Sequence, residues 1–253
     1  MKKIMTIAAA AATMLAVADG VESGIVGYQS KAVAKSEMVA LAVQFKDPSA
    51  TTFTVPVKDL VTVDVPKQGT AANGLTDQIH VWTGMAWKKY YNRKNVGWVS
   101  TDQADLTQET ADTVSVGDGV FFKRASSAAA NITTSGEVSV VDATKSVSVA
   151  KSEMKFLAYP WPTDFAIADF ASSDVVSAPK SGTGANGLTD QVHVWTGMAW
   201  KKYYNAKNVG FVATDQADKS VPTTDTISVG QCVFFKRASS AAATITFTKP
   251  AGL

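Results

Sequence analysis

Hydrophobic and polar positions alternate in short runs along most of this chain, which is the pattern of half-buried β-strands. The runs are rich in Val, Ile, Thr, Phe and Tyr, and Gly, Asn, Asp, Pro and Ser separate them; examples are "MVALAVQF", "QIHVW", "AWKKYY" and "GVFF". A helical spacing of apolar residues is not sustained anywhere after the first 18 residues. The pattern therefore predicts an all-β protein, with antiparallel β-sandwich and small-barrel architectures both open.

The N-terminus has the three parts of a secretory signal peptide. Two lysines precede an apolar run at residues 4–17, and Ala16 and Ala18 are placed for cleavage before Asp19. The run is too short and too rich in Ala to favour a membrane anchor, and no later segment is apolar enough to span a bilayer. We expect residues 1–18 to be removed and the mature protein to be secreted, either free outside the cell or held at its surface.

The chain contains an internal repeat. The stretch "VWTGMAWKKYYN" occurs unchanged at residues 81–92 and 194–205, and the flanking sequence matches at the same offset of 113 residues with few differences. A second identical stretch, "VFFKRASSAAA", ends in small and polar residues that predict a flexible loop. The repeat predicts two homologous tandem domains, 19–138 and 139–253, each folding around its own core.

The repeated block predicts a β-hairpin that turns at Thr83 and Gly84. Its aromatic and basic side chains are either core residues or an exposed platform for a ligand such as a sugar. Strand alternation turns adjacent residues to opposite faces, so only one of each tyrosine pair can lie in the core. The ligand-contact candidates are Trp82, Trp87, Lys88, Lys89, Tyr90, Tyr91, Trp195, Trp200, Lys201, Lys202, Tyr203 and Tyr204.

Charge adds little to this interpretation. The sequence has 24 basic and 22 acidic residues, and loss of Lys2 and Lys3 with the signal peptide leaves 22 of each. A neutral chain without a concentrated basic region argues against nucleic acid as a partner.

Catalytic and metal-binding patterns are weak. His80 and His193, one in each copy, are interpreted as structural strand residues in separate domains, and the single cysteine, Cys232, as a small buried residue. Aspartates in "TDQAD" and "GLTDQ" leave calcium open, although no calcium-loop pattern surrounds them. We therefore predict no enzyme activity, no cofactor and no metal site.

The pattern "DQ[IV]HVWTGMAWKKYY", followed by "GWV" and "VGDGVFFKR", resembles uncharacterised secreted bacterial β-repeat proteins of the cell surface or extracellular space. This resemblance implies export and a β domain, and it implies no activity.

The sequence favours an exported structural protein that self-associates into a fibre, surface layer or matrix. Polymerisation by β-strand addition would use the segment "DGVESGIVGYQSKAV", which we expect to lack a partner strand in its own chain. The alternative is a carbohydrate-binding or adhesive module that uses outward aromatic side chains of both copies.

Overall fold

The computed structural model describes residues 26–47, 52–138 and 143–253, so the predicted signal peptide lies outside the described residues. The described chain consists of twenty β-strands and two short 3-10 helices, which confirms the all-β prediction. Within the same residues, no helix is long and apolar enough to cross a membrane.

The first sequence copy, called repeat 1, contains β1 (Val26–Val33), β2 (Met38–Ala42), β3 (Phe45–Lys46), β4 (Thr54–Pro56), η1 (Val57–Asp59), β5 (Thr62–Val63), β6 (Gln78–Trp82), β7 (Trp87–Arg93), β8 (Gly97–Ser100), β9 (Thr113–Ser115), β10 (Gly119–Lys123) and β11 (Ala130–Val138). The second, repeat 2, contains β12 (Thr144–Val149), β13 (Met154–Ala158), β14 (Phe165–Ala166), η2 (Ile167–Ala171), β15 (Gln191–Trp195), β16 (Trp200–Ala206), β17 (Gly210–Ala213), β18 (Thr226–Ile227), β19 (Cys232–Lys236) and β20 (Ala243–Thr248).

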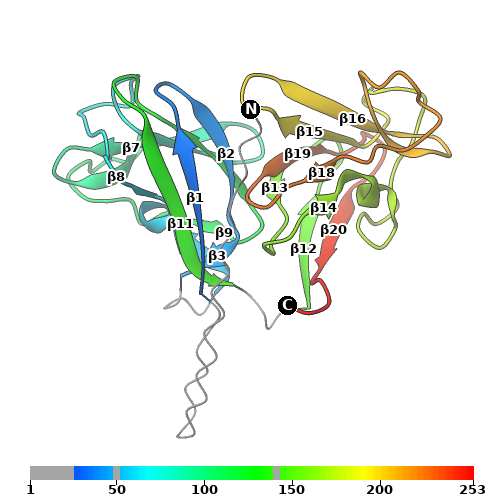
Figure 1. Cartoon of the computed structure of the whole chain (residues 1–253), viewed down its shortest axis with the longest axis horizontal. Coiled ribbons are helices and arrows are strands. Elements are labelled where there is room, and N and C mark those ends of the chain that lie inside the picture. The colour runs from blue at the N-terminus through cyan, green and yellow to red at the C-terminus, as the bar shows by residue number, and fades with distance from the viewer. Residues whose placement is uncertain (1–25, 48–51, 139–142) are drawn as a thin grey trace, which may run out of the picture.

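Each repeat builds the same five-stranded antiparallel sheet. Its order is β2-β10-β6-β7-β8 in repeat 1 and β13-β19-β15-β16-β17 in repeat 2. Every sheet in the described residues takes its strands from one repeat only, and none closes on itself. Figure 1 shows the two repeats side by side, repeat 1 in blue to green and repeat 2 in green to red.

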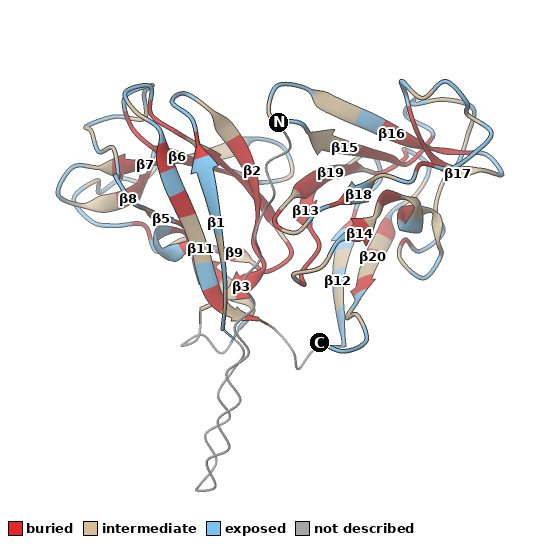
Figure 2. Cartoon of the chain, viewed as in Figure 1, coloured by how far each residue is buried: buried red, intermediate tan, exposed pale blue. Residues whose placement is uncertain are grey.

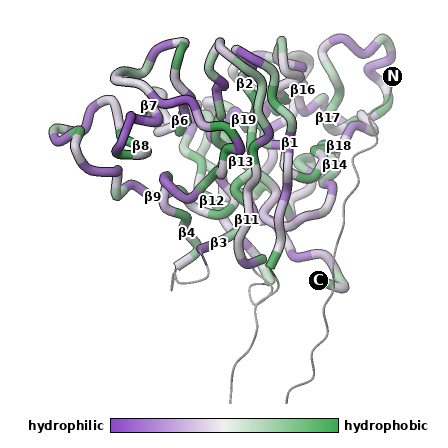
Figure 3. The backbone as a smooth tube through the Cα atoms, turned by 60° about the vertical axis from the view of Figure 1, so that its left-hand side comes forward, coloured by the Kyte–Doolittle hydropathy of each residue, from purple (hydrophilic) through white to green (hydrophobic). Residues whose placement is uncertain are grey.

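A hydrophobic core fills each repeat between the five-stranded sheet and its smaller sheets. Strand alternation decides which residues enter it: Val120 and Phe122 of β10 belong to the repeat 1 core, whereas Phe121 between them does not. In repeat 2, Val233 and Phe235 of β19 belong to the core, and Phe234 between them does not. Figure 3 shows hydrophilic stretches in the loops around β7, β8 and β9.

The predicted hairpin is present in both repeats. β6 pairs with β7, and His80 lies opposite Lys89 and Trp82 opposite Trp87. Residues 83–86 connect the two strands, and the amide of Thr83 donates to the carbonyl of Ala86 at 2.9 Å, so the tip of the turn is Gly84 and Met85 rather than Thr83 and Gly84. Gly84 has φ of 95°, a conformation in which a side chain is strained.

The N-terminal strand has a partner in its own repeat, so the expectation that it is unpaired is wrong. All eight residues of β1 pair with β11, and β12 pairs in the same way with β20 in repeat 2. Pairing within the repeat places Val33 of β1 and Ile132 of β11, each 1% exposed, in the same core. Burial of these side chains favours the local pairing over donation to a second chain.

The "RASSAAA" loop is anchored rather than free. Arg124 and Asp77 form an ion pair at 2.7 Å whose side chains are both 0% exposed, and the guanidinium also donates to the carbonyls of Val65 and Ala128. Arg237 and Asp190 make the equivalent ion pair at 2.6 Å in repeat 2. A buried charge is stable only when it is paired and hydrogen-bonded, so this pair closes the loop onto its repeat.

Candidate binding cleft between the repeats

A third hydrophobic cluster joins the two repeats, which differs from the expectation of domains that share no site. It consists of side chains on the sheet faces that point away from the two repeat cores. Figure 2 shows buried residues along β2, β13 and β19 at the centre of the molecule. The buried members of this inter-repeat cluster are Ala40, Ala42, Phe121, Phe156, Ala158, Cys232 and Phe234.

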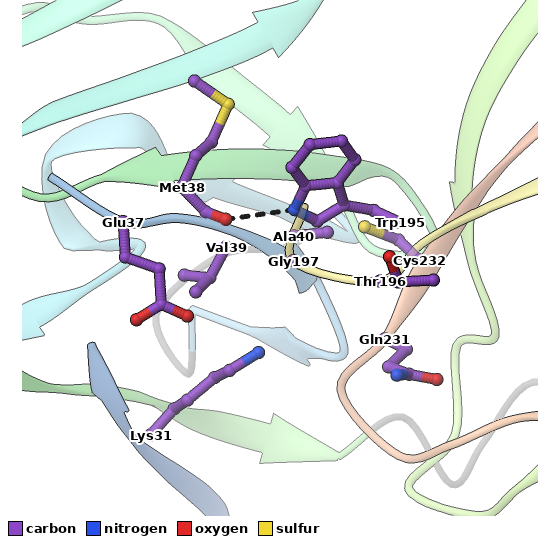
Figure 4. Close-up of a pocket in the computed structure, with 10 residues that line it drawn as sticks. All are labelled: Lys31, Glu37, Met38, Val39, Ala40, Trp195, Thr196, Gly197, Gln231 and Cys232. Carbon is purple, nitrogen blue, oxygen red and sulfur yellow. Dashed lines mark hydrogen bonds between the residues drawn. The ribbon is translucent and has the colours of Figure 1, made fainter. Parts of the chain in front are cut away.

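Two tryptophans make reciprocal hydrogen bonds across the contact. The indole Nε1 of Trp82 donates to the carbonyl of Met154 at 2.7 Å, and Nε1 of Trp195 donates to the carbonyl of Met38 at 3.1 Å. Figure 4 shows the second of these bonds, beside a cavity of about 150 Å³. Because equivalent residues exchange places in the two bonds, the repeats are related as the halves of a symmetric dimer.

Stacked phenylalanine rings form the centre of the cluster. Phe156 stacks on Phe121 with ring centroids 4.9 Å apart and on Phe234 at 4.6 Å. Trp87 and Trp200 each meet a phenylalanine of the other repeat edge-on, with centroids 5.8 and 5.9 Å apart. Offset and edge-on pairs of this kind add to the stabilisation from burial.

The two repeats differ where a symmetric contact would be too crowded. Phe156 and Cys232 of repeat 2 occupy the positions that Ala40 and Gly119 hold in repeat 1. A Cβ atom at Gly119 would lie 2.8 Å from Cβ of Cys232 and 2.9 Å from the Phe156 ring, which is too close for a real contact. Small residues of one repeat therefore accommodate large residues of the other, and the prediction that Cys232 is buried is confirmed.

An open cleft of about 500 Å³ lies beside this cluster and takes its walls from both repeats. It has three indole rings, two histidines and two lysines, together with phenylalanine and methionine side chains. The lining residues are Met38, His80, Trp87, Lys89, Phe121, Met154, His193, Trp195, Trp200, Lys202 and Phe234. The cleft therefore brings together His80 and His193, which the sequence placed in separate domains.

Both histidines of the cleft are neutral at pH 7. Burial lowers the pKa of each imidazole to about 4. Nearby positive charges add to this effect: Lys89 and Lys123 lower the pKa of His80, and Lys202 and Lys236 lower that of His193. The Gln78 amide donates to the carbonyl of Asn73, so its Oε1 faces Nε2 of His80 at 3.0 Å. In the neutral ring Nε2 then carries the proton, and Nδ1 is a hydrogen-bond acceptor.

The two lysines of each "WKKYY" stretch have different surroundings. Lys88, on the core side of the strand, makes an ion pair with Asp112 at 2.8 Å, and this contact raises the pKa of its ammonium. Lys89, on the cleft side, is exposed and has no ion-pair partner among the described residues. Lys201 and Lys202 repeat this division in repeat 2, where Asp225 holds Lys201 at 2.8 Å.

The tyrosines lie outside the cleft. The Tyr90 ring belongs to the repeat 1 core, and its hydroxyl donates to Asp112 at 2.9 Å; burial and this contact raise the pKa of the phenol. Tyr203 is placed in the same way against Asp225. Tyr91 and Tyr204 are also buried, on the opposite face of the sheet from Tyr90 and Tyr203.

Five of the sequence-predicted contact residues therefore line the cleft: Trp87, Lys89, Trp195, Trp200 and Lys202. Trp82 lies in the cluster behind it, and Lys88, Lys201 and the four tyrosines point elsewhere. Sequence reasoning did not select the histidines, methionines and phenylalanines of the cleft. Strand alternation could have identified His80 as a cleft residue, because it lies two residues from Trp82 on β6 and so shares its sheet face.

Five of the six aspartates considered as calcium ligands have hydrogen-bond partners in the structure, for example Asp77 and Asp105. Asp77 is paired with Arg124, and the side chain of Asp105 accepts from Thr107. Among the residues that the structure describes, no group of three or more His, Cys, Asp or Glu side chains could hold a metal ion. Comparisons of this chain with protein-family models, with curated proteins and with solved structures each gave no match.

Proposed function

We propose that this protein is a secreted carbohydrate-binding module whose ligand site is the cleft between the repeats. The observation that carries the proposal is the convergence of three partly exposed indole rings, from identical hairpins of both copies, on one cleft. One face of a pyranose ring consists largely of C–H bonds, and a flat aromatic ring buries that face well. The imidazole and ammonium groups beside it supply directional contacts for hydroxyl groups.

The proposal assigns the chain to two tandem homologous β-sandwich domains, 19–138 and 139–253, behind the signal peptide. Each domain alone has half of the cleft, because Trp87 and Lys89 come from one repeat and Trp200 and Lys202 from the other. The inter-repeat cluster would hold these halves at a fixed separation. Binding would then depend on the pair and not on two independent sites.

Glycan binding can be tested by intrinsic fluorescence and calorimetry, with neutral and acidic oligosaccharides as probes. We expect binding to shift the tryptophan emission and Trp87→Phe to weaken it severalfold, because the smaller ring covers less of the sugar. Trp98→Phe is the matched control: Trp98 is 5% exposed in the repeat 1 core, and repeat 2 already has phenylalanine, Phe211, at this position. Equal weakening by both variants, or no binding of any probe, would exclude the cleft as a glycan site.

A second candidate function, assembly into an extracellular filament or layer, rests on β1. This strand has one neighbour, β11, and its other edge has no partner strand in the described residues. Val26 and Tyr28 on it are 71% and 62% exposed. A long edge strand with exposed apolar side chains is a site for pairing with another chain.

Electron microscopy and light scattering of the mature protein test this candidate. We expect elongated assemblies that Tyr28→Lys disrupts, because a charge on an edge strand opposes pairing with another chain. A monomer at all concentrations would refute it.

A further inference from the structure

The cleft has unpaired positive charge in addition to its aromatic walls. Lys89 and Lys202 line it from opposite repeats, and no aspartate or glutamate is among its lining residues. Lys123 and Lys236 lie close enough to the histidines to lower their pKa values, and neither has an ion-pair partner in the part of the chain that the structure describes. Two ammonium groups thus line one aromatic cleft, and two more lie near its histidines, in a chain with 24 basic and 22 acidic residues.

We propose that the ligand of this cleft is an acidic oligosaccharide, whose carboxylate groups pair with Lys89 and Lys202 while its sugar rings lie on the indoles. This inference rests on the proposed function and adds the chemical class of the sugar. A neutral sugar would leave these ammonium groups without a partner, whereas carboxylates on the ligand would complement them.

The contrast between neighbouring lysines supports the assignment. Lys88 and Lys201 are neutralised by aspartates of their own repeats at 2.8 Å. Lys89 and Lys202, one residue further along identical strands, face the cleft without such a partner. The same sequence therefore supplies one structural and one available cation in each repeat.

The neutral histidines fit the same ligand. With Nε2 of His80 bound to Gln78, Nδ1 is an acceptor for a sugar hydroxyl, and His193 is held in the same way by Gln191 at 3.1 Å. The four lysines supply positive charge, and the neutral imidazoles supply hydrogen bonds. A volume of about 500 Å³ lies in the usual range for small-ligand sites and has room for a short oligosaccharide.

The test compares matched acidic and neutral probes on the full-length mature protein. Oligogalacturonate and hyaluronan oligosaccharides are measured by calorimetry beside their carboxyl-reduced forms, which keep the ring size and lose the charge. We expect the acidic forms to bind at least tenfold more tightly and their affinity to fall with added salt. An oligothymidylate of similar length serves as the nucleic-acid comparison, and tighter binding of that probe overturns the inference.

The variant Lys89→Met with Lys202→Met removes both cleft charges. We expect about a tenfold loss for the acidic probes and a much smaller loss for the neutral forms, which keep only hydrogen bonds to these lysines. Lys94→Met with Lys207→Met is the control, since these exposed lysines lie in equivalent loops after β7 and β16 and the change in net charge is the same.

The outcomes separate this inference from the proposed function. Equal binding of acidic and carboxyl-reduced probes, or an equal loss in the two lysine variants, overturns the acidic class and leaves glycan binding in place. Absence of binding by every oligosaccharide overturns both proposals.

Discussion

Replacement of Phe156 by alanine tests whether the inter-repeat cluster holds the molecule together. The phenylalanine is 3% exposed and stacks on rings from both repeats, with centroids 4.9 Å from Phe121 and 4.6 Å from Phe234. Repeat 1 already has alanine, Ala40, at the equivalent position of β2, so this residue type is compatible with the strand and with its pairing. The loss should therefore fall on the contact between repeats.

The expected magnitude follows from burial. An aromatic side chain buries about 150–250 Å², which at about 25 cal/mol per Å² corresponds to about 4–6 kcal/mol. The retained Cβ and partial relaxation reduce this value, and buried Phe to Ala changes cost about 3–5 kcal/mol in other proteins. We expect the free energy of unfolding to fall by about 3–4 kcal/mol, measured by urea denaturation.

Fluorescence distinguishes a loosened contact from a damaged repeat. Trp87 and Trp200 pack beside Phe156, with ring centroids at 5.7 and 6.5 Å, so acrylamide should quench the native variant more strongly than the wild type. Phe235→Ala is the control, because Phe235 is 0% exposed in the repeat 2 core and does not belong to the inter-repeat cluster. A loss below about 1 kcal/mol with unchanged quenching would refute the reasoning.

Three further predictions concern buried groups. Asp77→Ala leaves the Arg124 charge unpaired at 0% exposure, so thermal unfolding should show a loss of about 3–5 kcal/mol; a loss below about 1 kcal/mol would contradict the importance of this pair. His80 and His193 should titrate near pH 4 by NMR rather than near 6.5, and ordinary values would refute their desolvation. Between about pH 4 and pH 6.5 the unfolded chain binds more protons at these histidines than the folded chain does. The histidine contribution to the free energy of unfolding should therefore be fully present above about pH 6.5 and be lost as the pH drops towards 4. The Cys232 thiol, whose pKa burial raises, should react with a thiol reagent only after unfolding, and rapid labelling of the native protein would contradict its burial.

Local features of the fold could be predicted from sequence because they depend on near neighbours. Strand alternation placed Ile79 and His80 on opposite faces of their strand and left open which face is core; the structure has Ile79 in the repeat 1 core and His80 in the cleft. The hairpin at Gly84 was predicted by its turn residue and its flanking aromatic strands. The internal match predicted that both copies would fold alike, and both form the same five-stranded sheet.

Contacts between residues distant in the sequence could not be predicted in this way. Arg124 and Asp77 are 47 residues apart, and nothing in the local pattern of "RASSAAA" indicates a buried cation. The pairing of β1 with β11 joins the two ends of repeat 1. Both contacts depend on which groups the folded sheets bring together.

The function of the aromatic residues shows the same division. Sequence alone determined that Trp82, Trp87 and their copies lie on β-hairpins and that alternation gives each hairpin two different faces. It left open whether the outward face meets solvent, a ligand or other protein. Tertiary structure decided this by packing the two outward faces together, with Phe156 and Cys232 opposite the small residues of repeat 1. The physical reason is that burial of a sheet face depends on the shape of what covers it, and that shape exists only after both repeats have folded.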